Sequence, residues 1–327
     1  MGSDPISLPA LAMVRGEQPG GCELVMVFTQ PDRCHGRGMK LRPNPVKEWA
    51  LGEGLPVRQP DRCGESDAES LREAGVEAVL VMAYGQLLRK SFLASVPGGF
   101  YNLHASDLPR LRGASPIETA VASGRRQTAV SFMRIVPAMD AGPVADREFV
   151  AIEEEETSPE LREKMADACP PLLRRCLPAL REGRLRFVDQ EEDKATYCRM
   201  IGRGDAHLDF RAKADELVNR IRALQPWPGT SFPYGETELR VRAASSLPET
   251  AEAAPGTVLR AREGDLRIAC GSGQLRLHRL QRPGGKALPA ADFLRGFPLE
   301  EGNLLPSREM APLEAKEPFG MKKKKAR

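Results

Sequence analysis

Two short, uninterrupted apolar runs constrain the fold of this chain more than any other feature. They occupy residues 23–29 and 78–82 and read Glu-Leu-Val-Met-Val-Phe-Thr and Ala-Val-Leu-Val-Met. Runs of this length and composition are typical of strands buried on both faces, as in a parallel sheet that helices cover. Helix-like stretches separate the runs along the chain. The sequence therefore predicts βα units in its first half.

Further elements of the first half follow from local signals. Asn44-Pro45 ahead of residues 46–50 predicts a helix with an N-cap and a proline at its first position. Residues 66–74 predict another helix, and residues 100–104 and 128–136 predict two more strands. These elements together predict an α/β fold with a mainly parallel open sheet. In such folds the site lies at the carboxyl ends of the strands.

The second half has a different pattern of apolar and polar residues. Residues 238–242, 256–260, 266–270 and 274–280 alternate apolar with polar side chains and are separated by Gly and Pro. Short alternating strands between such turns predict a small β-barrel or sandwich.

The length of 327 residues favours two domains over one. The polar, irregular composition after residue 183 indicates a linker. The predicted boundaries are 1–183 for the first domain, 184–208 for the linker, 209–305 for the C-terminal domain and 306–327 for a basic, disordered tail.

Composition excludes several classes of protein. Hydrophobic residues make up 41% and charged residues 28%, and no apolar stretch approaches the length needed to cross a bilayer. The N-terminus lacks the features of a secretory signal, so we expect a protein of the cytoplasm without a membrane role. The seven cysteines are scattered and contain no Cys-x-x-Cys pair. We expect reduced thiols and no metal site.

The charge is unevenly distributed. The net charge is +3. Residues 203–327 hold 22 Lys and Arg against 16 Asp and Glu, and residues 1–202 hold 26 against 29. The basic second half is compatible with a polyanionic partner, although such an excess also serves solubility alone.

Three residues carry candidate chemistry. Asn102 and His104 lie two apart in a predicted strand and so share a face, and Asp140 stands in a turn after the next strand. An amide donor, an imidazole and a carboxylate could stabilise an oxyanion and move a proton, as acyl transfer requires. A histidine near a strand end can also be purely structural.

Residues 104–117, read with the Asn102 and Asp140 motifs, resemble the 10-formyltetrahydrofolate-dependent formyltransferases, and among them the methionyl-tRNA formyltransferases. The resemblance runs from Gly2 to about Gly302. Its supporting stretches are residues 2–11, 28–33, 36–47, 83–87, 225–229, 281–286 and 292–296.

The resemblance implies a Rossmann-like formyltransferase domain followed by an OB-like barrel. It implies transfer of a formyl group from 10-formyltetrahydrofolate to the α-amine of methionyl-initiator tRNA, for translation initiation and without a metal. Asn102, His104 and Asp140 would be catalytic. The folate donor would bind at Ala83, Tyr84, Gly85, Gln86, Leu87, Ser106, Leu108 and Pro109. The initiator tRNA would contact Arg33, Arg37, Lys40 and Arg42, unless these belong to an ordinary solvated loop.

Arg110 and Arg112 would be available to anionic groups. The family opens with a strand before the glycine that corresponds to Gly2, so we expect the first strand to be missing, or encoded upstream of Met1. A monomer is expected, in the cytoplasm, or in the mitochondrial matrix for a eukaryotic chain with an upstream extension. Two alternatives remain open. One is a formyltransferase for a small amine such as an amino sugar nucleotide, and the other is a noncatalytic tRNA- or folate-binding protein.

Overall fold

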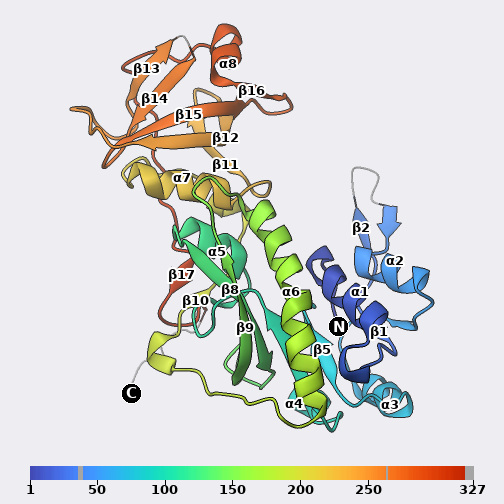
Figure 1. The fold of residues 1–327 in the computed structure, drawn as a ribbon. Helices are drawn as coiled ribbons and strands as arrows, with labels where there is room; N and C mark the ends of the chain where they lie inside the picture. The colour runs from blue at the N-terminus through green and yellow to red at the C-terminus, as the bar shows by residue number, and fades with distance from the viewer. Residues whose placement is uncertain (36–39, 263, 321–327) are drawn as a thin grey trace, which may run out of the picture. The chain divides into compact units, whose positions relative to one another are not determined.

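A computed structural model describes residues 1–35, 40–262 and 264–320, which form two compact units (Figure 1). The first unit comprises Met1–Gly113, Gln127–Ala151 and Arg162–Thr196. The second comprises Ala114–Arg126, Ile152–Leu161 and Tyr197–Arg327. No helix in the described ranges has the length and apolar character needed to cross a membrane.

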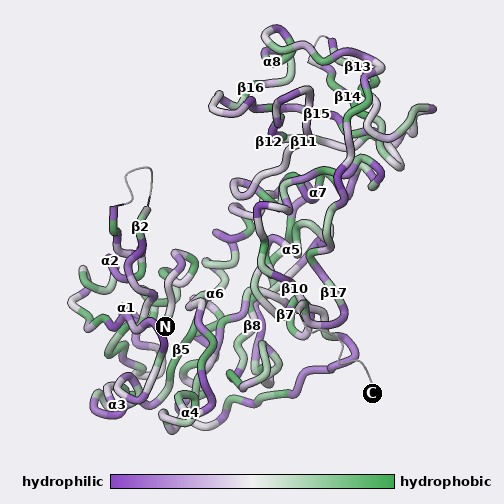
Figure 2. The backbone as a smooth tube through the Cα atoms, turned by 180° about the vertical axis from the view of Figure 1, so that it is seen from behind, coloured by the Kyte–Doolittle hydropathy of each residue, from purple (hydrophilic) through white to green (hydrophobic). Residues whose placement is uncertain are grey.

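The first unit contains the predicted parallel strands. Strand β1 (Val27–Phe28) pairs with β4 (Val57–Arg58), and β5 (Val79–Val81) pairs with β6 (Phe100–His104), both in parallel. Helix α1 (Leu8–Glu17) precedes β1, and the helices α2 (Pro45–Gly52), α3 (Glu65–Glu73) and α4 (Lys90–Leu93) lie between these strands in the sequence. Asn44 accepts a hydrogen bond from the Lys47 N–H at the start of α2, which confirms the predicted N-cap. The hydrophobic stretches along β5 are visible in Figure 2.

The chain start lies between β1 and β5. The Gly2 N–H donates to the Phe28 carbonyl (3.0 Å), and the Met82 N–H donates to the Met1 carbonyl (3.0 Å). Gly2 pairs with Met82 in parallel. Residues 1–2 therefore occupy the position where the resemblance places the first strand, and they join β1 to β5. The parallel order is β4, β1, residues 1–2, β5 and β6.

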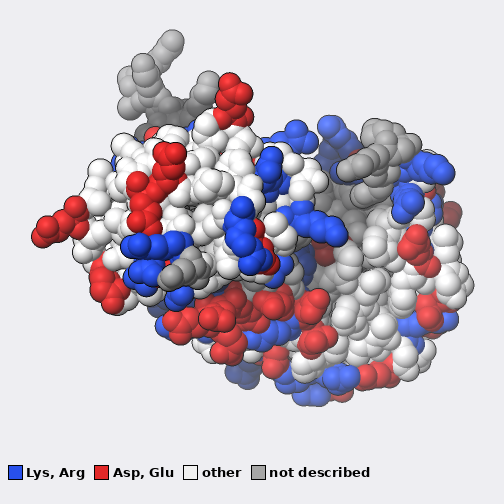
Figure 3. Space-filling view, turned by 90° about the horizontal axis from the view of Figure 1, so that it is seen from above, with Lys and Arg blue, Asp and Glu red and all other residues white. Residues whose placement is uncertain are grey.

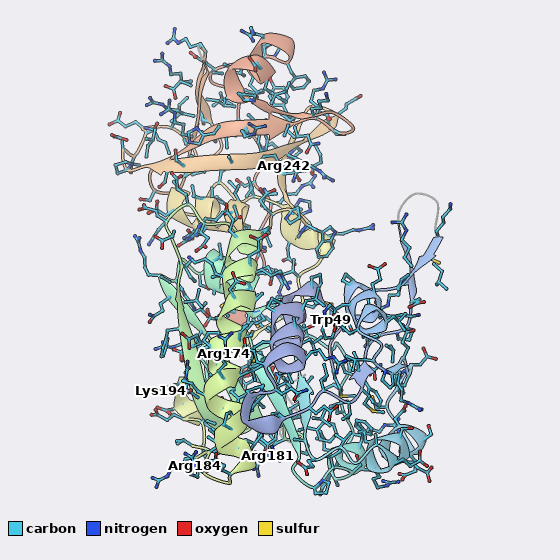
Figure 4. The ribbon with its side chains drawn as sticks, turned by 45° about the vertical axis from the view of Figure 1, so that its right-hand side comes forward. Trp49, Arg174, Arg181, Arg184, Lys194 and Arg242 are labelled. Carbon is cyan, nitrogen blue, oxygen red and sulfur yellow. The ribbon has the colours of Figure 1, made fainter. Side chains whose placement is uncertain are left out.

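The sheet continues with two antiparallel strands. Strand β8 (Gln127–Arg134) pairs with β6, and β9 (Val144–Ala151) pairs with β8. The long helix α6 (Ser158–Arg181) contributes Arg174 and Arg181, which Figure 4 labels beside α1. The Arg174 guanidinium bonds to both carboxylate oxygens of Glu17 on α1, at 2.6 and 2.7 Å.

The segment after α6 differs from the predicted linker. Phe187 stacks on Tyr101 with ring centroids 5.7 Å apart, and Val188 pairs with Val144 of β9. Thr196 accepts hydrogen bonds from the backbone N–H groups of Leu111 and Arg112 (each 2.9 Å). Residues 187–196 therefore pack on the first unit, because the irregular backbone finds partners along its sheet and loops.

The second unit is built around an antiparallel sheet of order β11, β12, β15, β14, β13, with β16 paired to β15. The described residues contain no β11–β13 ladder that would close this sheet. Its strands are β11 (Thr230–Tyr234), β12 (Thr237–Leu247), β13 (Val258–Arg262), β14 (Asp265–Ala269), β15 (Gln274–Gln281) and β16 (Ala287–Pro289). The helices are α5 (Pro116–Ala122), α7 (Ala214–Ala223) and α8 (Ala290–Gly296). Buried residues such as Phe210, Phe232 and Leu277 form its core.

The end of the chain is also more structured than the sequence predicts. Strand β17 (Glu314–Ala315) pairs with β10 (Tyr197–Cys198), and Leu313 packs with Ile201 and Leu224. Residues 306–320 therefore differ from the predicted disordered tail, because one apolar side chain and a short ladder hold them. Residues 321–327 lie outside the described ranges.

A buried carboxylate supports this C-terminal segment. Asp205 bonds to the guanidinium groups of Arg199 (2.8 Å) and Arg220 (3.1 Å), which also donate to the carbonyls of Pro312 and Ala311. Burial raises the pKa of the Asp205 carboxyl, but the hydrogen bonds from Arg199 and the Gly202 N–H and the charge of Arg220 outweigh it. The pKa therefore lies below the ordinary value.

The turn between β8 and β9 yields a test of the fold. A Cβ added to Gly142 would lie 1.9 Å from the Arg134 carbonyl oxygen. We expect Gly142→Ala to lower the free energy of unfolding by about 1–3 kcal/mol, measured by urea denaturation. Gly16→Ala is the control, since Gly16 is an exposed residue of α1 and nothing lies within 4 Å of its Cβ position. Gly16→Ala should raise the free energy of unfolding by about 0.5–1 kcal/mol. Equal changes in the two variants would contradict the close contact at Gly142.

Asp205 generates a second prediction. Asp205→Asn leaves Arg199 and Arg220 without their carboxylate, and should cost about 3 kcal/mol at pH 7. Because the folded pKa is depressed, the carboxylate stabilises the fold above its unfolded pKa of about 3.9 and loses this effect as the pH falls through the folded pKa. The gap between wild type and variant in unfolding free energy should therefore narrow below about pH 4. Asp292→Asn, at an exposed pair with Arg295, is the control and should show neither effect. A difference in unfolding free energy that is independent of pH would refute the stabilising role of the Asp205 carboxylate.

Candidate active site

His104, at the end of β6, is buried and contacts two parts of the protein. Its Nε2 lies 3.0 Å from the Leu111 carbonyl oxygen, and its Nδ1 lies 3.8 Å from Asp140 Oδ2. A carbonyl oxygen only accepts, so Nε2 carries a proton in this arrangement. The other nitrogen is therefore directed at a carboxylate, with which it forms an ion pair when it too is protonated.

Asp140 is held in an unusual backbone conformation. Its φ of 49° lies in the left-handed region, which side-chain-bearing residues adopt rarely. The carboxylate accepts a hydrogen bond from the Gly113 N–H (2.8 Å). The Gln190 side chain donates to the carbonyls of Asp140 (2.8 Å) and Gly142 (2.7 Å). These bonds to the Asp140 carboxylate and to the carbonyls of residues 140 and 142 hold the turn that places the carboxylate near His104.

Asn102 lies two residues before His104 on the same strand. It is paired with Val81 of β5 and Met133 of β8 and is half-buried. Its side-chain amide makes no hydrogen bond to any residue in the described part of the chain. The amide is consequently able to donate to a bound molecule, which a satisfied amide could not do without losing a partner.

The loop after β5 offers backbone groups more than side chains. Ala83 and Gly85 have φ values of 47° and 77°. Within the described ranges, the N–H groups of residues 83–87 make no hydrogen bond. Burial raises the pKa of the Tyr84 hydroxyl, which lies 3.3 Å from Cys63 Sγ in the core. The Gln86 side chain accepts from the Cys63 N–H and donates to the Pro60 carbonyl, whereas Leu87 is 86% exposed.

Residues 106–109 shape the loop that follows β6. The Ser106 hydroxyl donates to the Arg110 carbonyl (2.7 Å), and Leu108 is buried against Met133 and Val144. The Leu108–Pro109 peptide bond is cis. The side chains of Ser106 and Leu108 are thus engaged within the protein, whereas Pro109 is half-buried.

Arg112 corrects one prediction. It is 1% exposed, and its guanidinium bonds to Gln190 (3.0 Å) and to both carboxylate oxygens of Glu192 (2.9 and 2.7 Å). These hydrogen bonds lower the pKa of Glu192. The expectation that Arg112 is available to anionic groups is therefore wrong, while Arg110 has an exposed side chain near Asp107. Sequence reasoning missed Gln190, Glu192 and Thr196, because polar residues in an irregular segment carry no pattern.

The basic loop folds as a hairpin of β2 (Arg33–His35) and β3 (Lys40–Arg42). Arg33 lies opposite Arg42, and Arg33, Lys40 and Arg42 are exposed. Arg37 lies outside the described residues. Figure 3 shows Lys and Arg side chains interspersed with Asp and Glu over the face that it draws. No group of three His, Cys, Asp or Glu side chains among the described residues is arranged to hold a metal ion.

Comparisons with known proteins identify the family of this chain. The model of the formyl transferase family matches residues 8–177, and that of the formyl transferase C-terminal domain matches residues 200–298. Methionyl-tRNA formyltransferase of Methylobacterium sp. (strain 4-46) is 41% identical over 308 residues, 93% of this chain and 97% of the relative. The enzyme of that name from Methylobacillus flagellatus is 39% identical over 306 residues, 92% and 97% of the two chains.

A solved structure shares the fold. The N-formyltransferase of Helicobacter canadensis, in complex with folinic acid and dTDP-3-aminofucose, matches with a TM-score of 0.64 and 13% identity, over 84% of this chain and 96% of that chain. The two family models and the relatives cover both units, so the chain belongs to the formyl transferase family and, within it, to the methionyl-tRNA formyltransferases.

Proposed function

We propose that this enzyme transfers the formyl group of 10-formyltetrahydrofolate to the α-amine of methionyl-initiator tRNA. The observation that carries the proposal is the imidazole of His104, 3.8 Å from the Asp140 carboxylate, on the strand that also bears the unbonded Asn102 amide. The relatives that are about 40% identical over nearly the whole chain support methionyl-tRNA as the acceptor.

The proposed reaction passes through a tetrahedral intermediate. The acceptor nitrogen forms a bond to the formyl carbon, the carbonyl electrons move to oxygen, and the bond from carbon to N10 of the folate then breaks. Asn102 donates its amide to the oxyanion. Each such donor is worth roughly 3 kcal/mol of transition-state stabilisation in comparable oxyanion sites.

His104 and Asp140 serve the proton transfers in this proposal. Protonated His104 donates to the developing oxyanion through Nδ1, while its Nε2–H remains on the Leu111 carbonyl. Asp140 stabilises the imidazolium and accepts the proton that the attacking amine loses. That proton finally reaches N10 of the departing tetrahydrofolate.

The donor is proposed to bind at residues 83–87 and along the loop of Ser106, Leu108 and Pro109. A pterin ring has donors and acceptors along one edge, and the unbonded N–H groups of residues 83–87 fit its acceptors. Ala83 and Gly85 have a left-handed backbone, and the lack of a side chain at Gly85 would allow a ligand to approach closely. Leu87, which is exposed, would cover the ring.

The acceptor tRNA is proposed to contact the hairpin through Arg33, Arg37, Lys40 and Arg42. Paired exposed arginines on a narrow two-stranded ribbon suit contacts with phosphates.

We propose a monomer that works in the cytoplasm. Incubation with 10-formyltetrahydrofolate and charged initiator tRNA, an amino sugar nucleotide or no acceptor tests the function. Formylation of the sugar nucleotide alone would overturn the proposed function in favour of a formyltransferase for a small amine. Formylation of neither acceptor would favour a noncatalytic tRNA- or folate-binding protein.

Asn102→Ala tests the oxyanion role. We expect turnover with methionyl-tRNA to fall by about 10² to 10³, because one donor to the oxyanion is lost. Folate binding, measured by fluorescence titration or calorimetry, should be largely kept. Asn303→Ala, at an exposed asparagine of the second unit, should leave turnover unchanged. Weakened folate binding with normal turnover would contradict the role.

A triple variant tests the hairpin. Arg37→Ala, Lys40→Ala and Arg42→Ala together should weaken methionyl-tRNA binding and flatten the slope of log affinity against log salt, because fewer counterions are released. The matched control removes three exposed arginines elsewhere on the first unit: Arg72, Arg184 and Arg186. If both triple variants keep the wild-type affinity and slope, the hairpin does not bind tRNA.

A further inference from the structure

The side-chain amide of Gln190 joins two parts of the active site. Its Oε1 accepts a hydrogen bond from Arg112 Nε (3.0 Å), in the loop whose Leu111 carbonyl contacts His104. Its Nε2 donates to the carbonyls of Asp140 (2.8 Å) and Gly142 (2.7 Å). One amide therefore connects the loop behind the imidazole with the turn that carries the carboxylate.

We propose that Gln190 is a positioning residue that fixes the Asp140 carboxylate relative to His104 for the transfer step. This inference rests on the proposed function, since it assigns Gln190 a task in that reaction. Gln190 acts through Asp140 and does not touch the substrates.

Asp140 needs such support because of its backbone. A residue with a side chain leaves the left-handed region readily unless its surroundings prevent it. The two carbonyls that Gln190 holds belong to residues 140 and 142, so they bracket the turn. Relaxation of φ from 49° would swing the carboxylate away from His104 Nδ1 and from the Gly113 N–H, which holds it at 2.8 Å.

Support of Arg112 is the competing role for Gln190. The guanidinium of Arg112 is buried, and Gln190 supplies one of its acceptors besides Glu192. A residue that only satisfies this guanidinium would affect folding but not the transfer step. The two roles use different ends of the amide, so substitutions can separate them.

Two substitutions make this separation. Gln190→Glu keeps an acceptor for Arg112 and removes the N–H donors to the turn, and Gln190→Met removes both at similar volume. We expect each to lower kcat by about 10- to 100-fold with KM values for donor and tRNA within about threefold, because a small displacement of a reacting group costs this much. A Gln190→Glu enzyme with wild-type kcat would overturn the proposal.

Gln225 provides a matched control in the second unit. Its amide accepts from Arg242 (3.0 Å) and donates to the carbonyls of Ile221 (3.3 Å) and Val241 (3.2 Å), the same set of bonds away from the chemistry. Figure 4 labels Arg242 on the ribbon of this unit. Gln225→Glu should lower the thermal midpoint as much as Gln190→Glu does, with kcat unchanged. If kcat falls in proportion to the thermal midpoint in both the Gln190→Glu and the Gln225→Glu variant, the role of Gln190 is structural only.

A double-mutant cycle and one spectroscopic measurement complete the test. In an enzyme that already carries Asp140→Asn, Gln190→Met should lower kcat by less than about a further twofold, since both substitutions act through one carboxylate. Losses in kcat that multiply in the double variant would refute the positioning role. The NMR signal of the His104 ring, assigned among four histidines, should shift in the same direction in both single variants. An unchanged signal in Gln190→Met overturns the inference, whereas a wild-type enzyme that fails to formylate methionyl-tRNA contradicts the proposed function alone.

Discussion

The buried guanidinium of Arg112 is the constraint on which the site depends. A charge taken out of water destabilises a fold strongly unless partners satisfy it. Arg112 is 1% exposed, and its partners Gln190 and Glu192 belong to a segment far along the chain. Residues 187–196 must therefore lie against the loop of residues 108–113. Once this segment is there, Gln190 meets the Asp140 turn and Thr196 meets the backbone of Leu111, so one desolvated charge organises three parts of the site.

The chemistry makes opposite demands on neighbouring groups. His104 and Asp140 have most of their bonding fixed within the protein, which costs no reorganisation during the reaction. Asn102 and the N–H groups of residues 83–87, by contrast, have no partner in the described part of the chain. The first set is preorganised to act, and the second is available for a ligand. This division is the one expected if His104 and Asp140 are the acid–base groups proposed above and the loop backbone recognises the ligand.

Local signals predicted much of this arrangement. The apolar runs predicted β1 and β5, the Asn44-Pro45 pair predicted α2, and strand alternation brought Asn102 and His104 to one strand. The supports of the site could not be predicted in this way. Arg112 reads as one of several arginines in a basic run, and its partners are 78 and 80 residues away. The bonds of Gln190 and Thr196 use backbone carbonyls and N–H groups, which carry no sequence signal. Residues 306–320 are held by a short ladder, by the guanidinium groups of Arg199 and Arg220 and by the Leu313 contact, and all of these partners are distant in the sequence.

The position of Thr196 bears on how such proteins can be recombined. The last residue of the first unit is also a partner of the loop beside His104, and the next residue begins the C-terminal stretch of the second unit. A natural or engineered exchange of C-terminal domains at the apparent end of the α/β region, near residue 183, would transfer the support of the acid–base pair together with the foreign domain. In a fusion made at that position, Gln190 and Glu192 would come from a different relative than the Arg112 and Asp140 that they contact. Residues 184–196 therefore belong with the first unit, and a fusion of relatives that keeps these contacts should join them after position 196.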